Sequence, residues 1–314
     1  MSHSVIASQL DGLANQFLRT HLPDHEVIDI APGQLALEAP ADVFIVRPIN
    51  VRGNRVDNAP AGWPWSLRWV QLLSSGIDFY PDWLLKGPSV TSGKDANAEQ
   101  VAEFALALVF AAAKQLPDLW VKDSDWQLTA LAPVRGKTLG ILGFGHIGQS
   151  LARKANALGM RVLALSRPGQ AIAQIPGVER AEDLQQLFAG SDHLVIAAPL
   201  TAATRGLVDQ RVLASARPGL HLINIARGGL LDQQALLEAL DSGLIGRASL
   251  DVTEPEPLPA GHPLYSHPKV FLSPHTSAIS EEGLQLFLER FLDNFARYRE
   301  QAPLHNLVDT QRGY

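Results

Sequence analysis

The stretch TLGILGFGHIGQSLARKANALGMRVLALSR, residues 138–167, decides the fold of this chain. It begins with the apolar run Thr138 to Leu142, which predicts a buried strand, and the apolar spacing from Ile147 to Leu158 predicts an amphipathic helix. A second apolar run, from Arg161 to Leu165, predicts the next strand. The stretch is therefore a strand–helix–strand unit with a glycine-rich turn after its first strand.

The glycine-rich turn Gly143-Phe144-Gly145-His146-Ile147-Gly148 has the GxGxxG spacing of a dinucleotide-phosphate cradle. The first glycine permits a tight turn, the second lets the backbone approach a phosphate, and the third lets the helix pack against the sheet. The N–H groups and the dipole at the start of the helix favour negative charge there. We therefore expect the cofactor to bind at Gly143, Gly145, His146, Ile147 and Gly148, with His146, as a partly exposed loop residue, acting through its backbone.

Size and composition favour a two-domain globular protein with a small-molecule partner. The chain has 314 residues, of which 46% are hydrophobic, a formal net charge of −6 and no cysteine. Its scattered lysines and arginines form no basic stripe for nucleic acid or an anionic membrane, and the lack of cysteine excludes disulfides and thiolate catalysis. The N-terminus has no signal-peptide pattern, and the longest apolar run, Phe104 to Ala113, is too short to span a bilayer. We expect a cytoplasmic protein.

Short apolar runs alternate with helical stretches on both sides of the glycine unit. Before it, we predict a helix from Val5 to Leu18 and strands at Val27 to Ile30, Val43 to Val46 and Trp69 to Leu73. After it, we predict strands at His193 to Ala197, His221 to Ile225, Ala248 to Asp251 and Val270 to Leu272. Such alternation is typical of a doubly wound parallel sheet.

Two long helical stretches, Ala98 to Lys114 and Glu281 to Arg299, are predicted to connect two domains. The first leads into the nucleotide domain and the second leads back. The predicted fold is therefore α/β with two Rossmann-like domains, each built on a doubly wound parallel sheet. Residues 1–97 and 281–314 form a discontinuous, flavodoxin-like substrate domain, and residues 98–280 form an inserted dinucleotide-binding domain. Ligands of such folds lie at the carboxyl ends of the strands.

The two residues that follow the second strand of the glycine unit, Ser166 and Arg167, bear on the choice of cofactor. An NAD site usually has an acidic residue there, about 20 residues past the glycines, which binds the ribose 2′-hydroxyl. Neither side chain has a carboxylate, whereas a guanidinium and a hydroxyl suit a 2′-phosphate. We expect NADP(H) to be preferred. The alternative is that Arg167 is an ordinary solvated residue and that NAD(H) is used equally or preferred.

Three further segments place charged side chains after predicted strands. Ile223 to Gly229 ends in Arg227 beside two glycines, where a guanidinium can bind a carboxylate. Leu250 to Pro259 holds acidic residues in a proline-rich turn, and Leu272 to Ala278 places His275 just past the last strand. An arginine, a carboxylate and a histidine at the ligand-binding edge of the sheet are the side chains that a hydride-transfer site needs.

On these residues the chain resembles the D-isomer-specific 2-hydroxyacid dehydrogenase family, and within it is most similar to the NADPH-dependent glyoxylate/hydroxypyruvate reductases. The resemblance covers most of the chain. Its marks are Gly143 to Gly148, Ala198 to Thr201 with Thr204, Asn224 to Gly229, Asp251 to Pro259, and Ser273 to Ala278. It implies an oxidoreductase that reduces small 2-oxo acids, such as glyoxylate or hydroxypyruvate, to D-2-hydroxy acids without a metal.

The resemblance places the family's catalytic arginine, glutamate and histidine on Arg227, Glu256 and His275. Glu256 matches because the motif has its acid directly before Pro-Leu-Pro, and Glu254 is expected to be solvated. When a hydride reaches the carbonyl carbon of the substrate, His275 would donate a proton to the oxygen as general acid. Glu256 would orient the imidazole and favour its charged form, while Arg227 would bind the substrate carboxylate and polarise the carbonyl.

The resemblance also implies further cofactor contacts in the nucleotide domain. These fall on Pro199, Thr204, Ala226 and Asp251, the last through the nicotinamide carboxamide. In the first domain, Leu73 to Asp78 resembles the substrate loop, in which Ser75 and Gly76 would bind the substrate carboxylate. The family's Gly-Ala-Gly is Ser74-Ser75-Gly76 here, which leaves the backbone angle at Ser74 open. Arg47 is either a second substrate-binding cation or a surface arginine.

Two rival functions are a phosphoglycerate dehydrogenase-like enzyme and a nucleotide-sensing, corepressor-like binding protein. The first is disfavoured because the chain ends at Tyr314, which leaves no room for a regulatory domain. The second is disfavoured by the complete set of Arg227, Glu256 and His275. The resemblance implies a homodimer formed through the nucleotide domains, and the apolar content alone only permits one.

Overall fold

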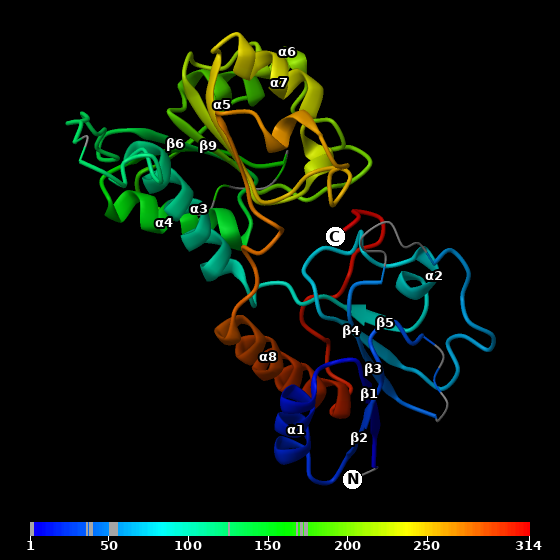
Figure 1. The fold of residues 1–314 in the computed structure, drawn as a ribbon. Helices are drawn as coiled ribbons and strands as arrows, with labels where there is room; N and C mark the ends of the chain where they lie inside the picture. Colours follow the sequence, from blue (N-terminus) through cyan, green and yellow to red (C-terminus); the bar gives the residue numbers. More distant parts are fainter. Residues whose placement is uncertain are drawn as a thin grey trace. The chain divides into compact units, whose positions relative to one another are not determined.

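The chain divides into two compact units (Figure 1). The computed structural model describes residues 3–35, 37, 40–49, 56–124, 126–167, 169, 172 and 175–314. The split unit consists of Met1–Asn97 and Ile279–Tyr314, and the inserted unit of Ala98–Ala278. The sequence predicts the return to the first unit at residue 281, whereas the structure places it at Ile279, because the contacts of Ile279 and Ser280 belong to the split unit.

The split unit contains a five-stranded parallel sheet in the order β2-β1-β3-β4-β5. Its strands are β1 (Val5–Ser8), β2 (Glu26–Asp29), β3 (Val43–Val46), β4 (Trp69–Leu72) and β5 (Ser89–Thr91). Its helices are α1 (Gly12–His21), α2 (Asp82–Leu85) and α8 (Glu281–Arg299). This strand order is that of a flavodoxin-like sheet, in which the order reverses between β1 and β3 and opens a ligand site at the carboxyl ends.

The returning helix α8 completes the core of the split unit. It packs beside α1 on one face of the sheet, where Phe287, Leu288, Phe291 and Phe295 are buried. Phe291 stacks on Trp69 of β4 with 5.1 Å between the ring centroids. This apolar stripe explains why a segment so far along the sequence belongs to the first unit.

No helix in the described ranges is long and apolar enough to cross a membrane.

The inserted unit contains a seven-stranded parallel sheet in the order β12-β11-β10-β9-β6-β7-β8. Its strands are β6 (Thr138–Leu142), β7 (Arg161–Leu165), β8 (Val178–Arg180), β9 (His193–Ile196), β10 (Leu220–Asn224), β11 (Ile245–Leu250) and β12 (Val270–Leu272). Its helices are α3 (Ala98–Ala113), α4 (His146–Ala157), α5 (Leu184–Gly190), α6 (Gln210–Leu213) and α7 (Gln233–Asp241), with short 3-10 turns at Gly228–Leu230 and Pro263–Tyr265. The strand order is that of a Rossmann sheet, with its reversal between β6 and β9.

Helices cover both faces of the inserted sheet, as the doubly wound prediction requires. α3 and α4 pack together on one face, and α5, α6 and α7 pack on the other (Figure 1). All described strands of both sheets run parallel to their neighbours. The predicted α/β class with two Rossmann-like units is confirmed.

The predicted helix from Val5 to Leu18 is wrong at its start. Val5–Ser8 is strand β1, which pairs with β2 on one side and β3 on the other, and α1 begins only at Gly12. The helix starts there because Asp11 caps it, with Oδ1 accepting a hydrogen bond from Ala14 N at 2.9 Å. The sequence analysis also missed β5 and β8, each of which has only three residues.

A buried histidine pair lies at the amino ends of β9 and β10. His193 Nδ1 is 3.0 Å from His221 Nδ1, and His221 Nε2 is 2.9 Å from Ser249 Oγ. Burial lowers the pKa of His193 to about 4, against the pull of Asp192, and it lowers the pKa of His221 well below 6.5. Both rings are therefore neutral in the folded protein at neutral pH.

We predict that this pair makes the protein sensitive to mild acid. The unfolded chain binds a proton at His193 near pH 6.5, whereas the folded chain does so only near pH 4. Between these two pH values protonation favours the unfolded chain, so the free energy of unfolding is highest above pH 6.5 and decreases as the pH falls towards 4. For one such histidine the decrease is on the order of 2 kcal/mol at pH 5. Urea unfolding at pH 7.5 and pH 5 measures this, and His193→Gln should reduce the difference. An equal pH dependence in both proteins would contradict the assignment.

Candidate active site

The turn between β6 and α4 gives its three glycines different surroundings. Gly143 has φ +100°, and a Cβ there would lie 2.6 Å from Ala198 N, so this position requires glycine. A Cβ at Gly148 would collide with the carbonyl oxygen of Gly143, so the helix lies directly on the turn. A Cβ at Gly145 would meet nothing within 4 Å, and the φ of −80° there suits any residue. The space at Gly145 is open, which is what a phosphate cradle requires.

The first turn of α4 faces the same open space. His146, expected in a loop, is the first residue of the helix and is exposed, and Gly145 is its N-cap without a side-chain cap. Within the described part of the chain, the N–H groups of Ile147 and Gly148 make no hydrogen bond. Such a helix start can receive an anion.

The end of β7 lies beside the turn, because Gly143 N donates a hydrogen bond to Leu165 O at 2.9 Å. The next two residues are Ser166, which is buried, and Arg167, which is exposed. A hydroxyl and a guanidinium thus follow β7 at the place where a carboxylate marks an NAD site.

The loop after β9 packs against the glycine turn and is closed by Thr204. Thr204 Oγ1 donates to Pro199 O at 2.7 Å and accepts from Thr201 N at 2.8 Å. The contact between Gly143 and Ala198 joins this loop to the turn. Both features therefore lie where the strand order reverses, at the ligand-binding edge of the sheet.

Arg227 follows β10 in a turn that Asn224 holds. Asn224 is fully buried; its Oδ1 accepts from Ala226 N at 3.1 Å and its Nδ2 donates to Arg227 O at 2.9 Å. Arg227 Nη1 donates to Ala226 O at 2.7 Å. The sequence analysis missed this role of Asn224, although an amide at the end of an apolar strand is a signal that could have indicated it.

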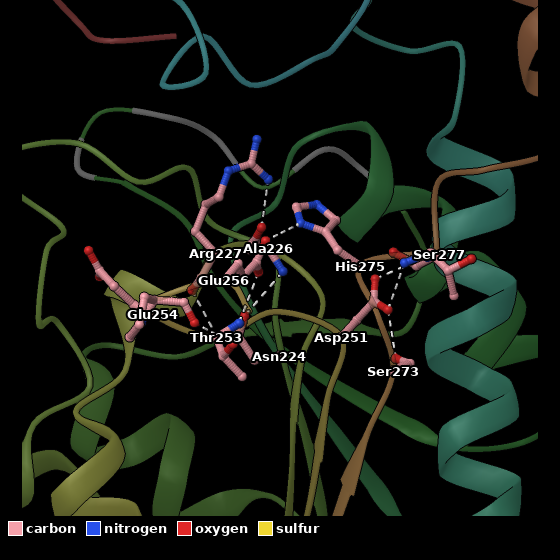
Figure 2. A network of polar contacts seen from close by, with 12 residues as sticks. Asn224, Ala226, Arg227, Asp251, Thr253, Glu254, Glu256, Ser273, His275 and Ser277 are labelled. Carbon is pink, nitrogen blue, oxygen red and sulfur yellow. Dashed lines mark hydrogen bonds and ion pairs between the residues drawn. The ribbon is translucent and has the colours of Figure 1, made fainter. Parts of the chain in front are cut away.

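Glu256 and His275 form a hydrogen-bonded pair in the site (Figure 2). His275 Nδ1 lies 2.9 Å from Glu256 Oε2, and Glu256 Oε1 accepts a hydrogen bond from Thr253 N at 3.0 Å. The two side chains are 30% and 34% exposed, so the pair is sheltered but accessible. Arg227 and His275 extend to the same side of their loops in Figure 2. Proton transfer to a ligand would use Nε2, the ring nitrogen that Glu256 does not hold.

Asp251 anchors the loop that carries His275. Its Oδ1 accepts from Ser273 Oγ at 2.6 Å and from Thr276 N at 3.0 Å, and its Oδ2 accepts from Ser277 N at 3.0 Å. Burial would raise the pKa of Asp251, but these hydrogen bonds outweigh it and the pKa lies below its ordinary value. His275 has φ +52°, a left-handed angle that a non-glycine residue keeps only where its surroundings fix it. Asp251 supplies that fixation.

Glu254 is exposed, as predicted for a solvated carboxylate. It also has a partner that the sequence did not predict, because Arg205 Nη1 lies 2.8 Å from both of its carboxylate oxygens. The sequence analysis missed the pair because the partners come from different loops, one after β9 and one after β11.

The loop after β4 in the split unit carries backbone N–H groups for which the described part of the chain offers no acceptor. Ser74, which stands where the family has glycine, keeps a negative φ, and its Oγ donates to Gly76 O at 2.7 Å. Ser74 N donates to the buried hydroxyl of Tyr80 at 3.3 Å, and burial raises the pKa of Tyr80 to about 12. Among the described residues, the N–H groups of Ser75, Gly76 and Ile77 find no acceptor. Three successive donors of this kind can bind a carboxylate.

Arg47 follows β3 at the carboxyl edge of the same sheet. Its N–H donates to Gln9 Oε1 at 2.9 Å, and Gln9 Nε2 donates to Gln34 O at 2.7 Å. Gln9 is buried directly after β1, and the sequence analysis missed it. The structure thus places Arg47, Ser75 and Gly76 at the ligand-binding edge of the split unit.

The inserted unit brings together groups whose chemistry suits acid catalysis on an anionic ligand. An imidazole held by a carboxylate can donate a proton, and a neighbouring guanidinium can bind a carboxylate or polarise a carbonyl. Three His, Asp or Glu side chains placed to hold a metal do not occur within the described ranges.

Comparisons with known proteins agree with this geometry. Residues 106–277 match the family model described as D-isomer specific 2-hydroxyacid dehydrogenase, NAD binding domain. The chain is 32% identical over 309 residues to glyoxylate/hydroxypyruvate reductase A of Serratia proteamaculans, covering 95% of this chain and 94% of that protein.

Two solved structures cover the whole chain. A D-isomer specific 2-hydroxyacid dehydrogenase from Xanthobacter autotrophicus, in complex with NADPH and MES, has a TM-score of 0.84 at 27% identity, and the match covers 100% of both chains. An NADPH-dependent glyoxylate/hydroxypyruvate reductase from Sinorhizobium meliloti, in complex with NADP and sulfate, has a TM-score of 0.80 at 25% identity, again over 100% of both chains.

Proposed function

Because the chain belongs to the D-isomer specific 2-hydroxyacid dehydrogenase family, whose members are NAD(P)-dependent oxidoreductases, we propose that it reduces small 2-oxo acids with NADPH. The substrates are of the glyoxylate and hydroxypyruvate type, and the products are D-2-hydroxy acids. The observation that carries this proposal is the Glu256–His275 pair at 2.9 Å, on loops beside that of Arg227.

His275, Glu256 and Arg227 divide the proposed reaction between them. A nicotinamide dinucleotide held at the glycine turn would supply the hydride for the carbonyl carbon. As negative charge grows on the carbonyl oxygen, His275 donates a proton to it from Nε2. Glu256 holds Nδ1 and balances the charge of the imidazolium. Arg227 binds the substrate carboxylate and polarises the carbonyl, which fixes the substrate and stabilises the developing charge.

Two places beside the glycine turn have the chemistry that a dinucleotide site needs, the start of α4 and the end of β7. The open space at Gly145 and the N–H groups of Ile147 and Gly148 suit the pyrophosphate. Ser166 and Arg167 suit a 2′-phosphate, so we propose a preference for NADPH over NADH. Further contacts are proposed from the loops that meet at this edge, at Gly143, His146, Pro199, Thr204, Ala226 and Asp251. Asp251 Oδ2, which accepts from Ser277 N at 3.0 Å, is proposed to accept a hydrogen bond from the nicotinamide carboxamide as well.

Ser75 and Gly76 are proposed to bind the substrate carboxylate through their N–H groups, which have no acceptor among the described residues. Arg47 is proposed to add a second cation for a polar or charged substrate tail. The hydrogen bond from Arg47 N to Gln9 Oε1 holds the backbone of Arg47, and this fixes the position from which its side chain extends.

A panel assay tests the function directly. NADPH and NADH oxidation would be followed with glyoxylate, hydroxypyruvate, pyruvate and 3-phosphohydroxypyruvate. We expect turnover of the first two acids and a higher kcat/KM with NADPH. The phosphorylated acid as best substrate would support the phosphoglycerate dehydrogenase alternative. Binding of NADPH without oxidation by any acid would support the nucleotide-sensing alternative.

Gly145→Ala is predicted to weaken cofactor binding without destabilising the free protein. The methyl group would meet nothing within 4 Å of the protein but would occupy the open space of the cradle. The lost charge-assisted hydrogen bonds correspond to a Kd for NADPH raised roughly 10-fold to 100-fold. Fluorescence titration and thermal unfolding measure both quantities. Gly148→Ala is the contrast, because its Cβ collides with Gly143 O and should lower the melting temperature. Unchanged NADPH affinity in Gly145→Ala would contradict the cradle.

We also propose a homodimer formed through the inserted unit. The segment between α3 and β6 exposes large apolar side chains, Trp120, Val121, Trp126, Leu128 and Leu131. Exposed apolar side chains gathered on one segment are typical of a protein–protein contact. Sedimentation equilibrium should give the mass of two chains; the mass of one chain would contradict the dimer.

A further inference from the structure

We infer that the Arg205–Glu254 ion pair positions the two loops that carry Arg227 and Glu256. Neither Arg205 nor Glu254 is assigned a contact with substrate or cofactor; the pair acts through the groups beside it. The inference rests on the proposed function, since it assumes that Arg227 and Glu256 take part in the reaction.

The ion pair lies directly on the backbone of the Arg227 loop. A Cβ at Gly229, two residues past Arg227, would collide with Glu254 Oε2 and would lie 3.0 Å from Arg205 Nη1. A Cβ at Gly228 would collide with the backbone of Thr253. The turn after β10 and the turn after β11 therefore touch backbone to backbone, and the two glycines make room for the carboxylate that joins them.

Other hydrogen bonds fix the same corner from both sides. Gln233 Nε2 donates to Glu254 O at 2.5 Å, and Glu254 N donates to Gln233 Oε1 at 3.2 Å. Gly206, next to Arg205, donates its N–H to Gly229 O at 2.8 Å. Arg205 thus links three loops, those after β9, β10 and β11, at the carboxyl edge of the sheet.

A short path leads from this pair to the proposed catalytic groups. Thr253, adjacent to Glu254, donates its N–H to Glu256 Oε1, and Glu256 holds His275 through Oε2. A shift of the turn at Glu254 therefore moves the donor that orients Glu256. On the other side, Gly228 and Gly229 directly follow Arg227, so a shift there moves the guanidinium. Displacements of about 1 Å at reacting groups can lower rates roughly 100-fold.

The exposure of the pair argues against a mainly stabilising role. The side chains of Arg205 and Glu254 are 57% and 49% exposed, and ion pairs in such surroundings contribute little to global stability. The effect of losing the pair should therefore appear in the kinetics rather than in the melting temperature.

Steady-state kinetics of Glu254→Gln and Arg205→Met with hydroxypyruvate and NADPH test the inference. We expect kcat/KM to fall roughly 10-fold to 100-fold, with KM for the oxo acid raised, and the melting temperature to change by no more than about 3 °C. Arg205→Lys should retain most of the activity, because a single nitrogen of Arg205 serves both carboxylate oxygens. The double variant should be no worse than either single variant, since both remove one interaction.

Glu179→Gln is the matched control. Glu179 pairs with Arg161 at 3.2 Å in the same unit, with side chains 60% and 65% exposed, but on β8 and β7 instead of the site loops. The substitution Glu179→Gln removes one negative charge, as Glu254→Gln does, and should leave KM and kcat unchanged. If Glu254→Gln behaves like this control, or if its loss of kcat is matched by an equal loss of folded protein with KM unchanged, the positioning role is overturned.

Arg227→Ala, assayed in parallel, separates this failure from a failure of the proposed function. Loss of activity in Arg227→Ala together with normal kinetics in Glu254→Gln overturns only the positioning role. Normal kinetics in Arg227→Ala overturns the proposed function and the positioning role with it.

Discussion

Replacing His275 with Asn should lower kcat for hydroxypyruvate reduction by roughly 100-fold to 10,000-fold, because the variant has no group that can donate a proton to the carbonyl oxygen. Asn is the preferred substitution because His275 has φ +52°, a backbone angle that Asn tolerates better than most residues. The loop should therefore keep its bonds to Asp251. The affinity for NADPH should change little, since the cradle lies on other residues. Stopped-flow kinetics with saturating cofactor and a separate NADPH titration measure the two effects.

His262→Asn is the control for this experiment. His262 caps the short 3-10 turn, where its Nδ1 accepts from Leu264 N at 3.2 Å, and it is assigned no contact with substrate or cofactor. It should leave kcat unchanged. A His275→Asn protein with normal kcat would remove His275 as proton donor.

Replacing Arg227 with Ala should lower kcat/KM by about 100-fold to 1,000-fold, the effect expected when a donor to a developing oxyanion is lost. KM should rise as well, because the same guanidinium is proposed to hold the substrate carboxylate. The turn itself should survive, since Asn224 binds the backbone at Ala226 and Arg227 and not the side chain. Kinetics with hydroxypyruvate, compared with thermal unfolding, measure the loss of activity and the integrity of the fold.

Arg227→Lys refines this test. Lysine retains the charge but cannot present two parallel donors to a carboxylate. We expect an activity between those of wild type and Arg227→Ala. Equal activity of the Lys variant and wild type would show that charge alone suffices and would contradict bidentate binding.

Local patterns predicted the parts of the fold that local physics determines. The GxGxxG spacing predicted a different role for each glycine of the turn, and the structure agrees: Gly143 has a positive φ, Gly145 faces open space and Gly148 packs against the turn. The bounds of β6 and α8 were predicted correctly for the same reason, since each has a continuous apolar run or stripe.

Features that depend on distant partners could not be predicted in this way. The sequence predicts a helix where β1 lies, because only the pairing with β2 and β3 makes the short run at Val5 a strand. The edge strand β8 has little apolar signal, because its residues are mostly exposed. In the site, the Arg205–Glu254 pair depends on a contact between two different loops, and no spacing along the sequence indicates such a contact.

One isotope experiment tests the central claim most directly. Wild-type protein would be incubated with hydroxypyruvate and NADPH carrying deuterium at the transferable position of nicotinamide C4, and the glycerate formed would be analysed by mass and configuration. The proposed reaction predicts one deuterium on C2 of D-glycerate, the former carbonyl carbon, for each NADPH oxidised. Glycerate without deuterium, or the L isomer, would contradict it.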